Sequence, residues 1–184
     1  MNTAEKFLQK KLKERIEKGS LRKLTSSSLP FDFCSNDYLG FAKSSTLKEM
    51  VEAQSKSFGN YNSGSGGSRL LSGNHKFTEE TEQLITNFHH AQSGLIFNSG
   101  YDANVGLLSA IPQRGDTIIT YELIHASLID GARLSHAERY KFKHNDLSDL
   151  KRKLKSAKGI CYVVVESVYS MDGDIAPLEE ISKL

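Results

Sequence analysis

Short apolar segments alternate with helical segments along most of this chain, and this alternation constrains the fold more than any other feature. The strongest apolar segment runs from Ile160 to Val165 and is rich in β-branched residues. Such a segment is typical of a strand that is buried on both faces of a parallel sheet. Strands that alternate with helices predict a layered α/β fold. We therefore expect a three-layer α/β/α arrangement around a mainly parallel sheet.

Hydrophobic periodicity and turn residues place the individual elements. Helices are expected at residues 4–18, 47–58, 77–88, 103–111, 125–134 and 147–154, with a first helical turn at 177–181. Strands are expected at residues 31–33, 95–97, 117–120, 140–142 and 160–165. We divide the chain into an N-terminal helix and connector, residues 1–45, and the first portion of a larger domain, residues 46–184. A crossover helix after a parallel strand should lead to another strand, so we expect this domain to continue beyond Leu184 and the fold to be incomplete.

Residues 59–73 are rich in glycine and serine and have two interpretations. Such a composition is typical of a flexible linker. Glycine also allows a backbone to pass close to a ligand or a partner chain, because it has no Cβ atom. Composition alone leaves both interpretations open.

Charge and cysteine content exclude several classes of protein. The 24 basic and 22 acidic side chains give a net charge of +2, which supplies no reason to expect a nucleic acid or an anionic membrane as partner. The longest apolar run is too short to span a bilayer. Only Cys34 and Cys161 are present, and the histidines show no paired metal spacing, so we expect no disulfide framework and no metal. The expected compartment is the cytoplasm.

Three polar segments follow expected strands, where ligands of parallel α/β sheets bind. The first, residues 97–104, contains Gly100 at the start of a helix, and backbone N–H groups there can bind a phosphate. The second contains His125, which could stack on an aromatic ligand or transfer protons, or could simply cap a helix. The third, residues 166–174, contains Ser170. Each segment taken alone is also compatible with an ordinary turn.

Signatures of other enzyme classes do not match. The glycine-rich segment 64–69 lacks the Gly-Lys-Ser/Thr ending of a P-loop and the third glycine of a dinucleotide-binding fingerprint. No serine has glycine at both flanking positions of a nucleophile elbow. A nucleotide-binding α/β protein would therefore require measured ATP binding as support.

Taken together and in order, six segments resemble the α-oxoamine synthases, a family of fold-type I pyridoxal-phosphate enzymes. The segments are residues 35–40, 64–69 with 72–73, 99–104, 125–127, 144–146 and 170–174. The resemblance implies a PLP-dependent transferase-like fold, a homodimer and pyridoxal 5'-phosphate as cofactor. It implies condensation of an acyl-CoA or acyl carrier protein thioester with an amino acid, with loss of CO₂. The most similar pattern belongs to the member that joins a pimeloyl thioester to L-alanine in biotin biosynthesis.

The resemblance also implies roles for single residues around the cofactor. Gly100 and Tyr101 match the pair whose backbone amides hold the cofactor phosphate. His125 matches the histidine that stacks on the pyridine ring and assists proton transfer, which makes it the catalytic candidate of this chain. Ser170 matches a serine that donates a hydrogen bond to the cofactor.

Substrate contacts are implied for Arg22, near the acyl substrate, for Asn36, near the thioester or the dimer interface, and for His125. The family's cofactor-binding lysine, its aspartate partner of the pyridine nitrogen and a second histidine belong to motifs beyond Leu184. Because a lysine Schiff base is central to this chemistry, we expect the chain alone to be inactive. Two alternatives stay open, namely a sibling enzyme with other substrates and a non-catalytic dimerisation or binding module of the same fold.

Overall fold

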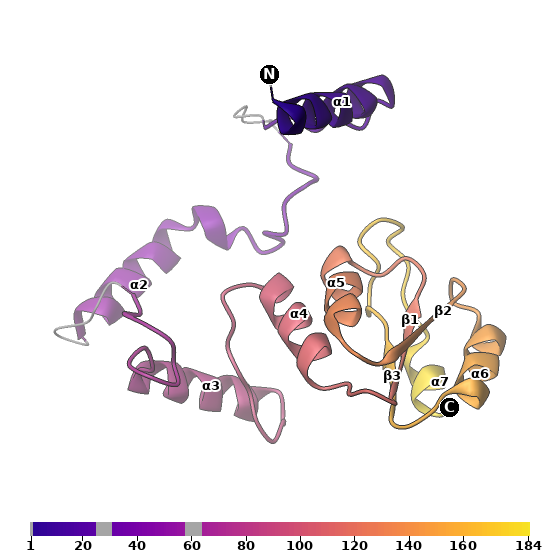
Figure 1. Cartoon of the computed structure of the whole chain (residues 1–184). Coiled ribbons are helices and arrows are strands. Elements are labelled where there is room, and N and C mark those ends of the chain that lie inside the picture. The colour runs from indigo at the N-terminus through magenta and orange to yellow at the C-terminus, as the bar shows by residue number, and fades with distance from the viewer. Residues whose placement is uncertain (1, 25–30, 58–63) are drawn as a thin grey trace. The chain divides into compact units, whose positions relative to one another are not determined.

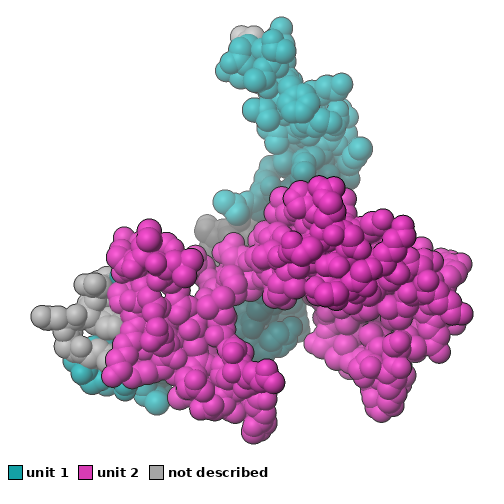
Figure 2. All heavy atoms as spheres, turned by 60° about the horizontal axis from the view of Figure 1, so that its bottom comes forward, with its two compact units in different colours: residues 1–64 teal, residues 65–184 magenta. Residues whose placement is uncertain are grey.

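The computed structural model describes residues 2–24, 31–57 and 64–184. The chain divides into two compact units, Met1–Gly64 and Ser65–Leu184, which Figure 2 colours separately. The division expected at residue 45 stays a prediction. Across the described ranges no helix is long and apolar enough to cross a membrane.

The first unit consists of helices and connecting segments. Its elements are α1 (Thr3–Glu17), the 3₁₀ helix η1 (Phe41–Lys43) and α2 (Ser45–Ser57). Helix α1 begins with a capping box, in which the Asn2 side chain accepts the N–H of Glu5 at 2.9 Å and the Glu5 carboxylate accepts the N–H of Asn2 at 3.0 Å. The helices predicted at 4–18 and 47–58 are confirmed, although residue 58 lies outside the described residues.

The strand predicted at residues 31–33 is wrong. The carboxylate of Asp32 accepts the backbone N–H groups of Cys34 at 2.9 Å and Ser35 at 3.0 Å. These bonds fold the chain into a local turn, because an aspartate side chain competes with a neighbouring strand for backbone donors.

A three-stranded parallel sheet is the centre of the second unit. Its order is β2 (Glu138–Phe142), β1 (Thr117–Tyr121) and β3 (Cys161–Val164). All three strands lie where the sequence predicts them. Strand β1 is completely buried because it pairs on both sides. Strand β3 is only half-buried rather than fully buried, because it forms an edge of the sheet in the described part of the chain.

Helices cover both faces of this sheet, as Figure 1 shows. Helices α4 (Gly100–Ala110) and α5 (Ala126–Leu134) lie on one side, and α6 (Leu147–Ser156) and α7 (Leu178–Ser182) lie on the other. The buried core includes Ile119 and Tyr121 of β1, Leu128 of α5, Phe142 of β2 and Leu150 of α6. This is the layered α/β arrangement with a parallel sheet that the alternating pattern predicts.

Helix α3 (Lys76–Phe88) is found where it was predicted, but the strand predicted at residues 95–97 is absent. The N–H of Ile96 donates to the carboxylate of Glu82 at 2.8 Å. This backbone donor therefore bonds to a side chain of α3 and not to a strand of the sheet.

The described part of the glycine-rich segment, residues 64–73, folds back on itself. A Cβ atom at Gly73 would lie 1.8 Å from the carbonyl oxygen of Gly67. The hydroxyl of Ser65 donates to the carbonyl oxygens of Gly67 at 2.7 Å and Gly73 at 3.1 Å. Glycine at position 73 is thus explained by contact of the backbone with itself.

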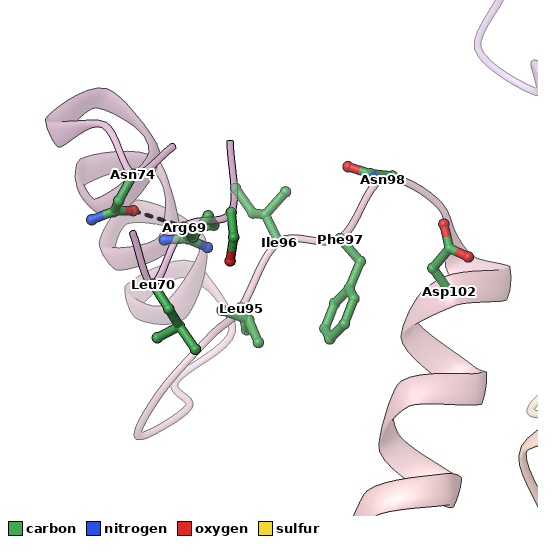
Figure 3. Close-up of a pocket in the computed structure, with 9 residues that line it drawn as sticks. Arg69, Leu70, Asn74, Leu95, Ile96, Phe97, Asn98 and Asp102 are labelled. Carbon is green, nitrogen blue, oxygen red and sulfur yellow. Dashed lines mark hydrogen bonds between the residues drawn. The ribbon is translucent and has the colours of Figure 1, made fainter. Parts of the chain in front are cut away.

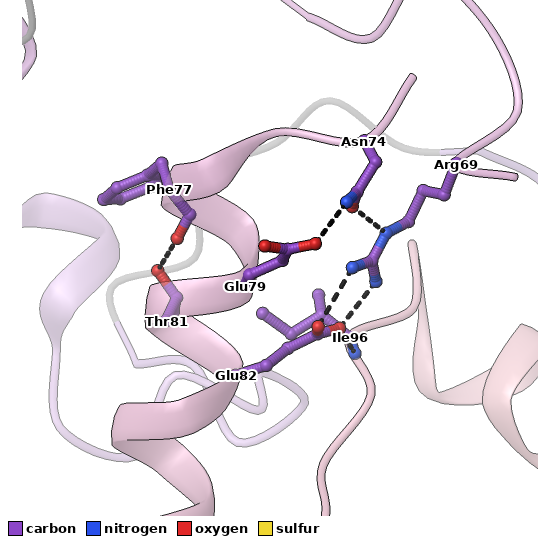
Figure 4. Close-up of polar contacts among 7 residues, drawn as sticks. All are labelled: Arg69, Asn74, Phe77, Glu79, Thr81, Glu82 and Ile96. Carbon is purple, nitrogen blue, oxygen red and sulfur yellow. Dashed lines mark hydrogen bonds and ion pairs between the residues drawn. The ribbon is translucent and has the colours of Figure 1, made fainter. Parts of the chain in front are cut away.

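Arg69 fastens this segment to α3, as Figure 4 shows. Its guanidinium donates to both carboxylate oxygens of Glu82, at 2.6 and 2.9 Å, and to Asn74 at 3.0 Å. The hydrogen bonds from Arg69, and next from the N–H of Ile96, lower the pKa of Glu82 from its ordinary value of 4.5 to about 2. One carboxylate therefore joins three segments of the chain.

Replacement of Glu82 by Gln tests this junction. Because the pKa of Glu82 is lowered in the folded state, its charge stabilises the fold above pH 4.5, and this contribution is lost as the pH falls from 4.5 through about 2. Urea unfolding should therefore show the wild type to be more stable than Glu82→Gln at neutral pH, with a difference that shrinks in acid. Glu80→Gln on the same helix is the control, since Glu80 is exposed and pairs with the exposed Lys76. An equal loss of unfolding free energy in both variants at every pH would contradict the stabilising role of the Glu82 charge.

Replacement of Gly131 by Ala tests the contact between α4 and α5. A Cβ atom at Gly131 would lie 2.9 Å from both the Asn104 carbonyl oxygen and the Leu108 Cβ atom. Overpacking should cost about 1–3 kcal/mol, more than the roughly 1 kcal/mol that alanine gains over glycine inside a helix. Thermal unfolding should show a lower midpoint for Gly131→Ala. The control Gly106→Ala places its Cβ at 3.4 Å from Phe97 and should not lower the midpoint.

Candidate functional site

The loops after the three parallel strands meet at one edge of the sheet and are bonded to one another. Glu166, after β3, accepts the backbone N–H of His125, after β1, at 2.6 Å. Glu122, at the end of β1, accepts the backbone N–H of His144, after β2, at 2.9 Å. Two carboxylates therefore hold three loops together at the carboxyl ends of the strands, where ligands of such sheets bind.

Helix α4 begins beside this edge with free backbone donors. The hydroxyl of Ser99 caps the helix by accepting the N–H of Asp102 at 3.0 Å. Gly100 and Tyr101 are the first two helical residues, so their N–H groups have no acceptor within the helix. Apart from its chain neighbours and the backbone of its own helix, no atom of the described residues lies within 4 Å of the position that a Cβ would take at Gly100. This helix start is open and can hold a phosphate group.

Tyr101 and His125 contact each other across α4 and α5. Their ring centroids are 6.3 Å apart, with an angle of 78° between the ring planes. The hydroxyl of Tyr101 donates to the carboxylate of Asp130, a bond that raises the pKa of Tyr101 above its ordinary value of 10. The Tyr101 side chain is thus fixed between the start of α4 and the second turn of α5.

His125 is the N-cap of α5. Its Nδ1 atom lies 3.2 Å from the N–H of Ser127 and 2.8 Å from the Ser127 hydroxyl. The Ser127 hydroxyl in turn accepts a hydrogen bond from the Asn104 amide at 3.0 Å. His125 therefore does cap the helix. The cap fixes the ring of an exposed histidine through Nδ1 and leaves Nε2 unused.

Ser170 lies in a tight turn at the same edge of the sheet. The N–H of Tyr169 donates to the carbonyl of Asp174 at 3.0 Å, and that of Gly173 to the carbonyl of Tyr169 at 2.8 Å. His144 contacts the Asp174 carboxylate at 2.6 Å, so it is a structural histidine that holds this turn. Ser170 is exposed and makes no hydrogen bond within the described ranges.

A hollow of about 620 Å³ lies next to the start of α4. Figure 3 shows the residues that line it. Its apolar part comes from Leu70, Leu95, Ile96 and Phe97, and Asn98 and Asp102 line its end at the helix. Tyr101, His125 and Ser170 are not among its lining residues.

The structure thus brings two of the predicted site residues, Tyr101 and His125, into contact, and Gly100 directly precedes Tyr101 in sequence. Ser170 is bonded to neither of them. Arg22 and Asn36 belong to the first unit, so their substrate roles stay predictions.

Several supporting residues were missed by sequence reasoning. Asn104, Ser127 and Glu166 lie inside the polar segments singled out from the sequence, whereas Asp130 follows no motif. Their supporting roles are visible only in the structure. Asp130 accepts a hydrogen bond from Tyr101, Asn104 donates one to Ser127, and Glu166 accepts the N–H of His125. No group of three His, Cys, Asp or Glu side chains that could hold a metal ion is found in the described part of the chain.

Comparison with known proteins agrees with this architecture. Residues 30–184 match the model of the family "Aminotransferase class I and II". The chain is 45% identical over 155 residues to a putative 8-amino-7-oxononanoate synthase of Bacillus licheniformis, covering 83% of this chain and 40% of that protein. It is 44% identical over 193 residues to the 8-amino-7-oxononanoate synthase of Emericella nidulans, covering 96% of this chain and 46% of that protein.

Among solved structures, a serine palmitoyltransferase variant with PLP is 34% identical with a TM-score of 0.71, covering 79% of this chain and 36% of that chain. The chain therefore spans less than half the length of these relatives. They confirm the resemblance to α-oxoamine synthases and the PLP-dependent transferase-like fold. On this evidence the chain belongs to the aminotransferase class I and II family.

Proposed function

We propose that this chain is the N-terminal part of an 8-amino-7-oxononanoate synthase, a pyridoxal-phosphate-dependent acyltransferase. The whole protein would condense pimeloyl-CoA, or a pimeloyl carrier-protein thioester, with L-alanine and release CO₂, as a step of biotin biosynthesis. The observation that carries the proposal is the contact between the open start of α4 and the His125 ring, at the edge where the strands end. The names of the relatives support the choice of reaction.

The residues of this edge fit pyridoxal 5'-phosphate. The free N–H groups of Gly100 and Tyr101 suit its phosphate, because a helix start favours a dianion. The planar ring of His125, exposed and fixed by Ser127, suits a face of a pyridine ring. When bound, this cofactor supplies an electron sink at the Cα atom of an amino acid.

The remaining roles follow the family pattern. The His125 imidazole would bind one face of the cofactor and move a proton at the reacting carbon, as a histidine can near neutral pH. Ser170 would donate a hydrogen bond to the cofactor, for which its free hydroxyl is available. Arg22 would lie near the acyl substrate, and Asn36 would lie near the thioester or the dimer interface.

A homodimer is the proposed assembly. Leu70 and Leu71 of the glycine-rich segment are 95% and 87% exposed, which is unusual for adjacent leucines and is consistent with cover by a partner. The alternatives of the same family are a serine palmitoyltransferase-like enzyme and a 2-amino-3-ketobutyrate CoA ligase. They differ in their amino acid, so release of CoA with serine or glycine in place of alanine would favour them.

Release of CoA by the whole protein tests the proposal. With pimeloyl-CoA and L-alanine, CoA release should depend on added pyridoxal phosphate, and His125→Ala should lower kcat/KM by about 10²- to 10⁴-fold, the range of a lost acid–base group. His136→Ala is the matched control, because His136 is exposed and takes part in none of the described bonds of the site. Full activity of His125→Ala would refute the catalytic role of His125. If the whole protein released no CoA with any amino acid, the proposed acyltransferase activity would be refuted.

The 184-residue chain by itself should release no CoA and should hold pyridoxal phosphate weakly or not at all. The reason is that the family's cofactor-binding lysine has no counterpart among the matched motifs, and this lysine provides the covalent attachment. Absorbance of the purified chain with added cofactor measures this directly. A stable Schiff-base band together with turnover would contradict the expectation.

A further inference from the structure

The imidazole of His125 is held by hydrogen-bond donors at one nitrogen. Nδ1 lies 3.2 Å from the backbone nitrogen of Ser127 and 2.8 Å from the Ser127 hydroxyl oxygen. The backbone N–H group can only donate, so it favours a lone pair on Nδ1, but its contact is the longer of the two and the nearer hydroxyl decides whether Nδ1 accepts. When Nδ1 accepts, the single proton of a neutral imidazole resides on Nε2.

Asn104 determines the direction of this chain of bonds. Its amide nitrogen donates to the Ser127 hydroxyl oxygen at 3.0 Å. The Ser127 side chain is completely buried, and its one hydroxyl hydrogen remains for the acceptor at Nδ1 of His125. Each group therefore donates to the next: Asn104 of α4 donates to Ser127 of α5, and Ser127 donates to His125.

We propose that Asn104 and Ser127 are positioning residues that keep the proton of neutral His125 on Nε2 and fix the orientation of its ring. Nε2 bonds to nothing else in the described part of the chain, so its N–H remains available beside Tyr101. The tautomer stands on these bonds alone, whereas its use in proton transfer rests on the proposed function.

Long-range ¹H–¹⁵N NMR of the ring nitrogens measures the tautomer directly in the unliganded chain. The signals of His125 are assigned by their loss in His125→Gln. In the wild type, above the pH at which the ring is charged, we expect an Nδ1 shift typical of an unprotonated nitrogen and an Nε2 shift typical of a protonated one. A single tautomer should be seen, in contrast to the mixture of a histidine whose ring nitrogens have no fixed hydrogen-bond partner.

Asn104→Asp replaces the hydrogen-bond donor of Asn104 with an acceptor of nearly the same size. A carboxylate only accepts, so the Ser127 hydroxyl should turn towards it and present a lone pair to Nδ1. The Nδ1 signal should then move towards the protonated position. Ser127→Ala removes the relay and should give a mixture of tautomers. The matched control is Asn87→Asp on α3, where Asn87 accepts a bond from Gln83 at 2.9 Å and has no contact with His125.

The proposal is overturned if wild-type His125 carries its proton on Nδ1 or populates both tautomers. It is also overturned if Asn104→Asp and Ser127→Ala give folded spectra with both ring nitrogens at wild-type positions. The wild-type measurement decides even if both variants unfold. Since no cofactor or substrate is added, a negative result here differs from a failure of the CoA-release assay.

Discussion

The pairing of β1 with a parallel neighbour on each side is the constraint on which the candidate site depends. Because all three strands run in the same direction, the loops that follow them emerge at one edge. His125, His144 and Glu166 come from three different loops and meet there. The loops are held by two carboxylates: Glu122 accepts the N–H of His144 at 2.9 Å, and Glu166 accepts the N–H of His125 at 2.6 Å. An antiparallel sheet would have distributed these loops over two edges.

A second condition is the close approach of α4 and α5. Gly131 allows it, since a Cβ atom there would meet the backbone and a side chain of α4 at 2.9 Å. The approach brings Tyr101 to His125 and Asn104 to Ser127. One helix start thus faces the N-cap of the other, and an exposed histidine acquires a fixed ring. The same residue is at once a structural cap and the candidate catalytic group.

The helices and the three strands of the sheet could be predicted from periodicity, because each carries an apolar face that must be buried. The two failed strands have a different physical origin. Residues 31–33 and 95–97 have strand-like composition, but side chains bond to the backbone there. The Asp32 carboxylate accepts the N–H groups of the two residues that follow the first segment, and the Glu82 carboxylate accepts the N–H of Ile96. The bond to Glu82 joins residues far apart in sequence, so no local pattern could reveal it.

The sequence by itself determined the alternation of helices and strands, the parallel α/β class and the short motifs that resemble one enzyme family. It determined these because they depend on local periodicity and on residues close together along the chain. The tertiary structure decided that Glu166, Asp130 and Asn104 support Tyr101 and His125, and that Arg69 bonds Glu82. Such bonds join segments distant in sequence, and their partners are set only when the strands pair and the helices pack.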